Sequence, residues 1–411
     1  MADLSALRSL FSNKNFAIYV SGNSISLIGF WMQRVAISWL TWEITESEFW
    51  VGAVAFAELG PLLVISPIMG VWVDRVNRKL LTIVNQSTMM LVSFVLFMLI
   101  IFDLISIQVL FTFALLDGIL QATHQPIRMA IIPNLVERKD IVSASSFTAV
   151  VFNVARLLGP ALAGVVIALF GTSVAVICNT ISYIPILLAW CYIKLPAMKA
   201  HNSEDSFTKG LVEGINYVKN IPALGHIFIL QTVLACGIRP ATLMLAAFVG
   251  AVYKGGAEQL ALYTAVLGMG AVIGGMYITL RGKAKGLVNS MLRNSFISII
   301  ALAVFAWTTD VYVGLFALFV IGWTITLSSV SSQTMVQNSI DDEIRGRVLS
   351  LWAALTRGAA AIGVLIIGFF ADYYGLFWTN ISAALLCLIG LIWFWQKSSQ
   401  MQSYFEKELM S

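Results

Sequence analysis

The hydrophobic residues of this chain are gathered into long, nearly uninterrupted runs. Runs of about twenty apolar residues recur from one end to the other, and each is long enough to cross about 30 Å of hydrocarbon as an α-helix. Strands of a β-barrel would instead alternate polar and apolar residues. The runs predict twelve spanning helices, at approximately 15–41, 50–72, 79–102, 106–127, 141–168, 172–195, 221–250, 258–280, 287–307, 312–338, 345–371 and 376–397.

Composition and charge support an all-α integral membrane protein. Hydrophobic residues make up 59% of the chain and charged residues 11%, whereas about a quarter of a soluble domain is charged. Placing both termini in the cytoplasm puts most of the 25 Lys and Arg residues in cytoplasmic segments and leaves Lys254 outside. We therefore expect a multi-pass protein of the inner or plasma membrane with cytoplasmic termini. The basic residues follow this orientation rule, so they indicate no nucleic-acid partner.

Polar segments outside the runs divide the chain near its midpoint. Residues 1–14 place leucines at helical spacing among polar residues, which is typical of a short helix on a membrane surface. The expected division is an amphipathic cytoplasmic N-terminus at 1–14, an N-terminal six-helix bundle at 15–195, a cytoplasmic linker at 196–220, a C-terminal six-helix bundle at 221–397 and a cytoplasmic tail at 398–411.

An internal repeat relates the two bundles. Shifting the second half over the first by 204 residues superposes six glycine pairs: Gly52 and Gly256, Gly70 and Gly274, Gly118 and Gly322, Gly159 and Gly363, Gly164 and Gly368, and Gly171 and Gly375. With nine glycines before residue 208 and 21 after it, chance would give about one match. Glycine persists where helix backbones approach closely. The sequence therefore predicts two six-helix pseudo-repeats.

A charged motif stands between the second and third spans. Gly70, Asp74, Arg75, Arg78 and Lys79 match the pattern G-x-x-x-D-R-x-x-R-[KR]. The major facilitator superfamily carries this signature in the same loop, so the chain resembles that superfamily over its whole length. The resemblance implies the major facilitator fold and a transporter rather than an enzyme.

A second segment resembles one branch of that superfamily. Arg156, Gly159, Pro160 and Gly164 fall in a stretch similar to the exporter-associated G-P-x-x-G-G pattern, with Ala163 replacing one glycine. With QPIRMAIIPNLV after span four and IRGRVLSLW at span eleven, the chain looks most similar to enterobactin exporters and macrolide efflux pumps, which are drug:proton antiporters.

The resemblance assigns the charged loop a conformational role. In the family the loop is a cytoplasmic clasp, and its aspartate lies at the start of span eleven, where a helix N-terminus favours an anion. On this chain Asp74 would lie near residues 345–349 and would stabilise the state that is closed to the cytoplasm. The second half has Ile278 in the place of the aspartate, so we expect one clasp.

Six ionisable side chains lie clearly inside the predicted spans: Arg34, Glu58, Asp117, Arg156, Arg239 and Arg357. Each costs on the order of 3 kcal/mol at a span centre unless it is paired or hydrated. In the family, spans one, four, seven and ten line the central cavity. The candidate cavity residues are therefore Arg34, Gln121, His124 and Arg239, and the candidates for proton coupling are Asp117 and Glu58.

Several of these residues have a structural alternative. Arg34 and Glu58 lie in the outer halves of adjacent spans and would also serve as a structural ion pair. Arg156 precedes Pro160 by four residues and would stabilise the helix where proline removes a backbone donor. His124 is either a hydrogen-bonded core histidine or a proton carrier. Arg357 has no obvious partner in its own helix, so no role is assigned to it.

These observations favour a secondary active transporter. No G-x-x-x-x-G-K-[ST] phosphate loop is present, so an ion gradient is the expected energy source, and the resemblance implies protons. Four buried arginines against two carboxylates favour an anionic or zwitterionic ligand. We expect a monomeric proton-coupled exporter of a small amphipathic molecule, siderophore-like, anionic or drug-like, that works by alternating access in the lipid bilayer.

Other functions stay open at this point. They are an importer or lipid transporter on the same fold, or a non-transporting sensor. No catalytic residue, cofactor or metal site is predicted: the four cysteines lie in apolar stretches without metal-ligand spacing.

Overall fold

The computed structural model describes residues 9–73, 76–194, 207–281 and 286–408. These residues form helices and short connections, with no strand among them. In this part of the chain, nine helices are long and apolar enough to span a bilayer, and the count is ten if the bent pair Val212–Asn220 and Pro222–Gly237 is taken as one span. The predicted all-α membrane fold is confirmed.

The first half contains seven spanning helices or helix segments. They are α2 (Lys14–Thr45), α3 (Glu48–Leu59), α4 (Pro61–Trp72), α5 (Arg78–Ile101), α6 (Ile107–Leu135), α7 (Ile141–Phe170) and α8 (Thr172–Tyr192). The second predicted span is divided at Gly60, because Pro61 supplies no backbone N–H and begins a new helix. A short 3-10 turn, η2 (Arg138–Asp140), precedes α7.

The second half repeats this arrangement with a more broken first span. Its elements are α10 (Pro222–Gly237), α11 (Arg239–Leu243), α12 (Leu245–Ala247), the π-helical η3 (Phe248–Val252), α13 (Ala257–Arg281), α14 (Leu287–Trp307), α15 (Val311–Asn338) and α16 (Asp342–Gln396). Gly375 has φ 79° and ψ 158°, so α16 turns there and forms two spans.

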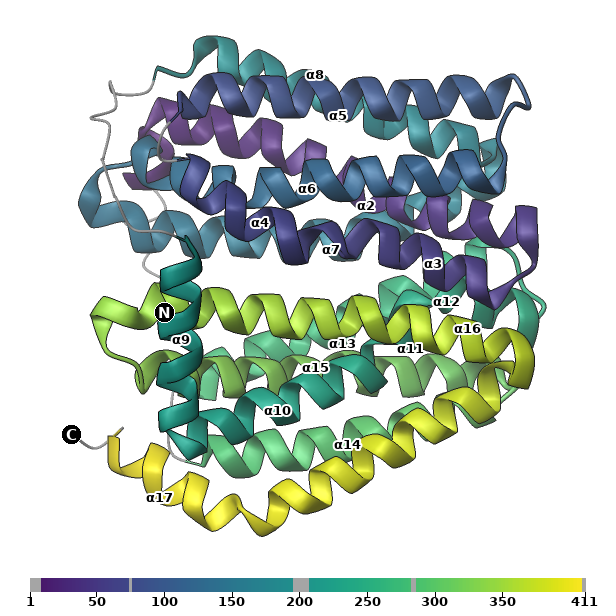
Figure 1. Cartoon of the computed structure of the whole chain (residues 1–411). Helices are drawn as coiled ribbons and strands as arrows, with labels where there is room; N and C mark the ends of the chain where they lie inside the picture. Colours follow the sequence, from purple (N-terminus) through teal and green to yellow (C-terminus); the bar gives the residue numbers. More distant parts are fainter. Residues whose placement is uncertain (1–8, 74–75, 195–206, 282–285, 409–411) are drawn as a thin grey trace.

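Two further helices lie at one end of the bundle. Helix α9 (Phe207–Asn220) meets α10 at 111°, and α17 (Ser398–Glu408) follows the last span. Figure 1 shows α9 lying across the spanning helices at the end where α2 begins and α17 lies. We call this end the near end and the opposite end the far end. The segment 196–220, predicted as a linker, thus contains a helix.

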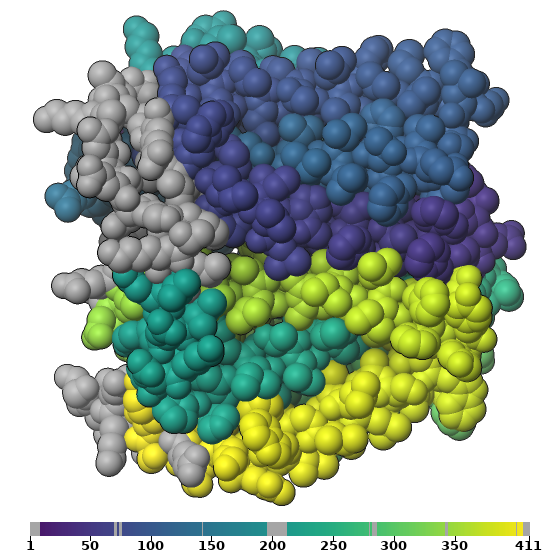
Figure 2. Space-filling model, in the orientation of Figure 1, coloured from purple at the N-terminus to yellow at the C-terminus, as the bar shows by residue number. Residues whose placement is uncertain are grey.

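The helices form two bundles that pack side by side. Helices α2 to α8 lie in one half of Figure 1 and α10 to α16 in the other, and Figure 2 shows α16 packed along the first half. The halves touch at the far end. There the Ser47 hydroxyl donates a hydrogen bond to Asp372 at 2.9 Å, and the Phe49 backbone N–H donates to the same carboxylate at 3.4 Å.

The glycine repeat has a direct structural counterpart. Gly171 and Gly375, which are 204 positions apart, both adopt positive φ, 84° and 79°, at corresponding turns before the sixth and twelfth spans. L-residues with a side chain rarely adopt this conformation. The same turn therefore requires glycine in both halves.

Close helix packing is repeated as well. Gly159 lies against α2 at Trp31, and Gly363 lies against α10 at Cys236. Gly118 packs against the Ala57 carbonyl of α3, and Gly322 against the Leu267 carbonyl of α13. Gly164 touches α13 at Ala261, and Gly368 touches α3 at Gly52. The predicted two pseudo-repeats are therefore present in the packing of the spans.

The contact at Gly52 gives a test of the interface between the halves. A Cβ at Gly52 would lie 2.6 Å from the Val364 carbonyl oxygen and 3.1 Å from the Gly368 Cα, so Gly52→Ala forces α3 away from α16. We expect a loss of stability of about 1 to 3 kcal/mol, as for other overpacked contacts, measured by thermal unfolding in detergent. Gly275→Ala is the control, since its Cβ has only Thr326 within 4 Å, at 3.9 Å. An equal effect at both positions would contradict the expectation.

Candidate functional site

An ion pair joins the first two spans in the interior. Arg34 Nη2 of α2 lies 3.1 Å from Glu58 Oε2 of α3, and the two side chains are 22% and 11% exposed. The guanidinium also lies 5.3 Å from the ring centroid of Trp31, within the range of a cation–π contact. The geometry matches the structural pair that the sequence left as an alternative to a cavity role.

A second carboxylate accompanies this pair. Asp117 of α6 is 8% exposed, and it lies close enough to Glu58 and Arg34 to interact with both charges. The next residue, Gly118, allows this approach: a Cβ there would lie 2.7 Å from the Glu58 carbonyl oxygen. Arg34, Glu58 and Asp117 form what we call the acid group, with two carboxylates and one guanidinium.

The acid group lies at one depth in the bundle. Glu58 follows the first residue of α3 by ten positions, and Asp117 follows the first residue of α6 by ten. Both helices begin at the far end, so these carboxylates lie about 15 Å along their helices from it. They are therefore inside the apolar layer rather than at its edge.

The part of α6 that lies toward the near end carries further polar side chains. Gln121 and His124 are partly buried, and the His124 Nδ1 atom is buried with no hydrogen-bond partner among the described residues. Arg128 donates a hydrogen bond to Gln125 Oε1 at 3.0 Å and lies 5.5 Å from the ring centroid of Phe152. Both alternatives for His124, a core histidine and a proton carrier, stay predictions.

Three arginines from both halves lie near one another. Arg239 of α11 interacts with the charges of Arg357 on α16 and Arg156 on α7. In the described part of the chain, no carboxylate forms a salt bridge with any of the three. The Arg156 Nε atom is buried without a hydrogen-bond partner there. We call Arg156, Arg239 and Arg357 the arginine cluster.

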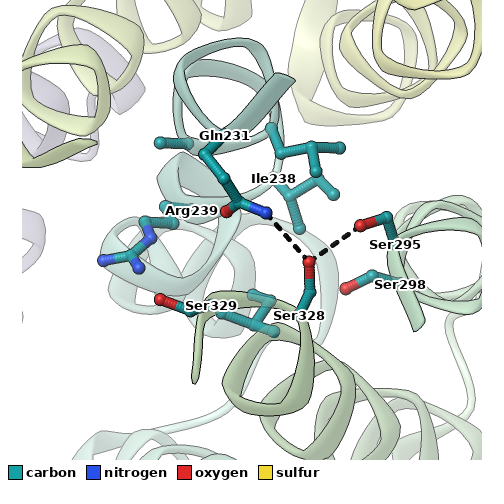
Figure 3. Close-up of a pocket in the computed structure, with 10 residues that line it drawn as sticks. Gln231, Ile238, Arg239, Ser295, Ser298, Ser328 and Ser329 are labelled. Atoms are coloured by element: carbon teal, nitrogen blue, oxygen red, sulfur yellow. Dashed lines mark hydrogen bonds between the residues drawn. The ribbon is translucent and has the colours of Figure 1, made fainter. Parts of the chain in front are cut away.

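A small cavity adjoins the cluster. It measures about 20 Å³ and Arg239 forms part of its wall, which is room for about one water molecule. Gln231 Nε2 donates to Ser328 Oγ at 3.1 Å, and Ser295 and Ser328 share a hydrogen bond of 2.8 Å. Figure 3 shows the Arg239 guanidinium directed away from these hydrogen bonds. Apart from Arg239, the polar groups of the wall are therefore neutral, and none is an acid.

The segment around Pro160 is a continuous helix. Helix α7 runs through Pro160 to Phe170, and the Arg156 Nε atom has no hydrogen-bond partner among the described residues. The Arg156 carbonyl oxygen, whose helical donor Pro160 lacks, faces Gly268, where a Cβ would lie 3.5 Å away. Helix α13 therefore packs against the Arg156 carbonyl oxygen at Gly268.

The charged loop motif is only partly described. Asp74 and Arg75 lie outside the described residues. Arg78 donates a hydrogen bond to the Ala130 carbonyl at 3.1 Å, and Lys79 donates to the Ile193 carbonyl at 2.7 Å. These bonds tie the start of α5 to the near-end portions of α6 and α8. The clasp itself, including the role of Gly70 in α4, stays a prediction.

Buried amides form a second polar feature that the sequence analysis did not identify. Gln33 accepts hydrogen bonds from Ser93 at 2.6 Å and Asn179 at 2.8 Å, which joins α2, α5 and α8. Gln231 plays a similar part in the second half. A glutamine inside an apolar span was the available signal, since a buried amide needs partners on neighbouring helices.

Comparison with solved structures identifies the fold. The chain superposes on a bacterial homologue of the human lysosomal transporter Spinster with a TM-score of 0.74 and 13% identity, covering 96% of this chain and 98% of the other. A bacterial homologue of the iron transporter ferroportin gives 0.70 and 18%, covering 92% and 98%. The fold is that of major facilitator transporters, as predicted.

The family follows from the sequence. The family model described as transmembrane secretion effector matches residues 5–407, so the chain belongs to this family. It is 25% identical to the staphyloferrin A transporter of Staphylococcus aureus over 87% of this chain and 90% of the relative. It is 23% identical to the enterobactin exporter EntS of Citrobacter koseri over 94% and 89%. The chain is a multi-pass membrane transporter, not an enzyme.

The ion pair between Arg34 and Glu58 should contribute to the stability of the protein. Glu58→Gln leaves Arg34 without its 3.1 Å partner, and removing one member of a buried pair costs on the order of 3 kcal/mol. Thermal unfolding in detergent should show this loss. The double variant Arg34→Met with Glu58→Met should recover most of it, because the guanidinium that lost its partner is removed as well. A double variant as unstable as Glu58→Gln would show that the pair does not act as a unit.

Proposed function

We propose that this transporter is a proton-coupled exporter of a small, amphipathic, acidic molecule of the siderophore-like class. The single observation that carries the proposal is the separation of interior charge into an acid group and an arginine cluster. The first has one more carboxylate than cation, and the second has no carboxylate partner among the described residues. The relatives named above support the substrate class by analogy.

The acid group supplies the proposed coupling site. Two carboxylates that share one guanidinium carry a net charge of −1, and one proton brings that charge to zero. Arg34 interacts with both Glu58 and Asp117. A proton that binds and leaves here therefore changes the interior charge, which biases the equilibrium between two conformations.

The proposed movement is rocking of the two bundles, here taken as 15–195 and 221–397. The contacts of Asp372 with Ser47 and Phe49 close the far end, and we propose that they break when the carrier opens there. The Asp74 clasp would then hold the near end closed. The positive-inside distribution supports a cytoplasmic near end in the inner or plasma membrane.

Transport assays test the function directly. Inside-out vesicles containing the protein, with an imposed acid interior, should accumulate a catecholate siderophore, and a protonophore should abolish the accumulation. A macrolide and a cationic dye complete the panel. Vesicles with the vector alone are the control. Accumulation of only the cationic dye would overturn the acidic substrate class, and accumulation that resists the protonophore would overturn proton coupling.

Asp117 is the residue on which coupling should depend most. Asp117→Asn removes one carboxylate from the acid group, so proton-driven accumulation should fall to the vector level while gradient-independent exchange of substrate persists. Glu137→Gln is the matched control, because this carboxylate pairs with Lys139 in an exposed turn. Normal proton-driven transport by Asp117→Asn would refute the assignment. Loss of both transport modes would indicate a binding or folding role instead.

A further inference from the structure

A buried amide of α2 joins three helices beside the acid group. The Ser93 hydroxyl of α5 and the Asn179 Nδ2 atom of α8 both donate hydrogen bonds to Gln33 Oε1, at 2.6 Å and 2.8 Å. All three side chains are buried. Gln33 precedes Arg34 in the sequence, so this contact of three helices lies at the depth of the ion pair between Arg34 and Glu58.

The two donors to Gln33 are themselves fixed by neighbouring groups. The Thr180 hydroxyl lies 2.8 Å from Ser93 Oγ, within hydrogen-bond distance. The Ser182 hydroxyl donates to the Asn179 backbone carbonyl at 2.7 Å and lies 3.2 Å from Asn179 Oδ1. Two fixed donors on different helices therefore define the position of one amide oxygen. Moving that oxygen would leave buried polar groups unpaired, which costs free energy.

Close packing of α2 on α8 brings Gln33 within reach of Asn179. A Cβ at Gly22 would lie 2.9 Å from the Ile186 Cα, and a Cβ at Gly29 would lie 2.9 Å from Asn179 Oδ1. Gly22, Gly29 and Gln33 follow one another at intervals of seven and four residues, so they share one face of α2. The glycines permit the close approach, and the directional hydrogen bonds of Gln33 fix how α2 is rotated within it.

The rotation of α2 decides where Arg34 lies. Four hydroxyl groups of α2 form hydrogen bonds that turn with the helix, because they bond to carbonyls of α2 itself: Ser21, Ser24, Thr41 and Thr45. Arg34 lies about 100° around the helix from Gln33. A rotation of about 20° would move a side-chain tip 5 to 6 Å from the axis by about 2 Å. Such a movement is enough to separate Arg34 from Glu58, which lies 3.1 Å away.

We propose that Gln33 is a positioning residue for the acid group. Its two hydrogen bonds hold the rotation of α2 at which Arg34 faces Glu58, and the nearby guanidinium sets how tightly the acid group binds its proton. Gln33 acts through Arg34 and not by contact with proton or substrate. The step from the ion pair to proton exchange rests on the proposed function, whereas the step from Gln33 to the ion pair does not.

A double-variant cycle measures the positioning without any transport. Glu58→Gln removes the ion pair, and Gln33→Leu removes the amide. Glu58→Gln should lower the melting temperature in detergent less than half as far in the Gln33→Leu background as in the unmodified protein, because the pair is already weakened there. Equal lowering in both backgrounds would give Gln33 a purely structural role and would overturn the proposal.

The second half offers a matched control for this cycle. Gln231 is a buried amide of α10 that donates to Ser328 and Ser332 of α15, at 3.1 Å and 2.8 Å, and Figure 3 shows the first of these bonds. It stands eight residues before Arg239 and not next to an arginine. In the Gln231→Leu background, Glu58→Gln should therefore keep its full effect. A reduction equal to that with Gln33→Leu would attribute the result to general loosening of the protein and would overturn the proposal.

A milder variant keeps the test decisive where Gln33→Leu does not fold. Ser93→Ala removes one of the two hydrogen bonds and leaves the Gln33 amide in place. Its cycle with Glu58→Gln should depart from additivity in the same direction and by less. Strict additivity in a folded Ser93→Ala protein, with Gln33→Leu either additive or unfolded, would overturn the proposal.

The pH profile of transport provides a second readout. A carboxylate that loses a guanidinium neighbour binds its proton more tightly and stays protonated to a higher pH. Gln33→Leu should therefore move the pH midpoint of proton-driven siderophore accumulation in inside-out vesicles upward by on the order of one unit. Gln231→Leu should leave the midpoint where it is. A merely structural role of Gln33 would lower the rate at every pH without moving the midpoint.

The two readouts separate the positioning role from the proposed function. Additive effects in the cycle alongside proton-driven export would overturn the positioning role alone. A non-additive cycle alongside transport that ignores the proton gradient would leave the positioning of Arg34 standing and overturn proton coupling. A non-additive cycle with an unmoved pH midpoint would support the link from Gln33 to the ion pair and overturn its effect on proton exchange.

Discussion

The free energy required to keep a charge inside the apolar layer of a membrane is the constraint on which this molecule is built. Every ionisable side chain there needs a counter-charge, a dipole or water. Arg34 meets this requirement with Glu58 at 3.1 Å, and the pair holds α2 against α3. Asp117 joins them because Gly118 lets α6 approach the α3 backbone. The same contact that packs the helices therefore creates the excess negative charge on which the proposed proton exchange depends.

Much of the fold could be predicted because it follows from local and periodic features. Long apolar runs indicated the spans, and glycines 204 positions apart indicated the repeat. The structure explains why glycine is required: Gly171 and Gly375 share a positive φ, and Gly159 and Gly363 share a close helix contact. The breaks within spans were harder to predict from the sequence. Pro61 was visible in the sequence, but the apolar run continues through it, so hydrophobicity alone predicted one helix.

The sequence indicated which residues belong to the candidate site, but not how they are arranged in space. Counting ionisable residues within spans found Arg34, Glu58 and the four others. Whether Arg34 pairs with Glu58 depends on the rotation of α2 and α3 about their axes, which composition does not determine. The proximity of Arg156 to Arg239 joins helices from different halves, so no motif in either half contains it. The sequence offered a structural alternative for Arg156 beside Pro160, its neighbour in sequence, because local contacts are the ones a sequence displays.

The repeat also shows how a duplicated scaffold acquires two kinds of chemistry. Both halves keep the turn, the glycine contacts and an arginine at corresponding positions, so the backbone constraints are shared. The acids are not shared: at the shift of 204 residues, Ile321 and Leu262 stand where the first half has Asp117 and Glu58. Such a difference changes charge with little change in packing, because Gly118 contacts the backbone of Glu58 and not its carboxylate. One half can then hold exchangeable protons while the other, left positive, can attract an anion. Because rocking moves both halves together, charge changes in one alter the conformational equilibrium that the other experiences.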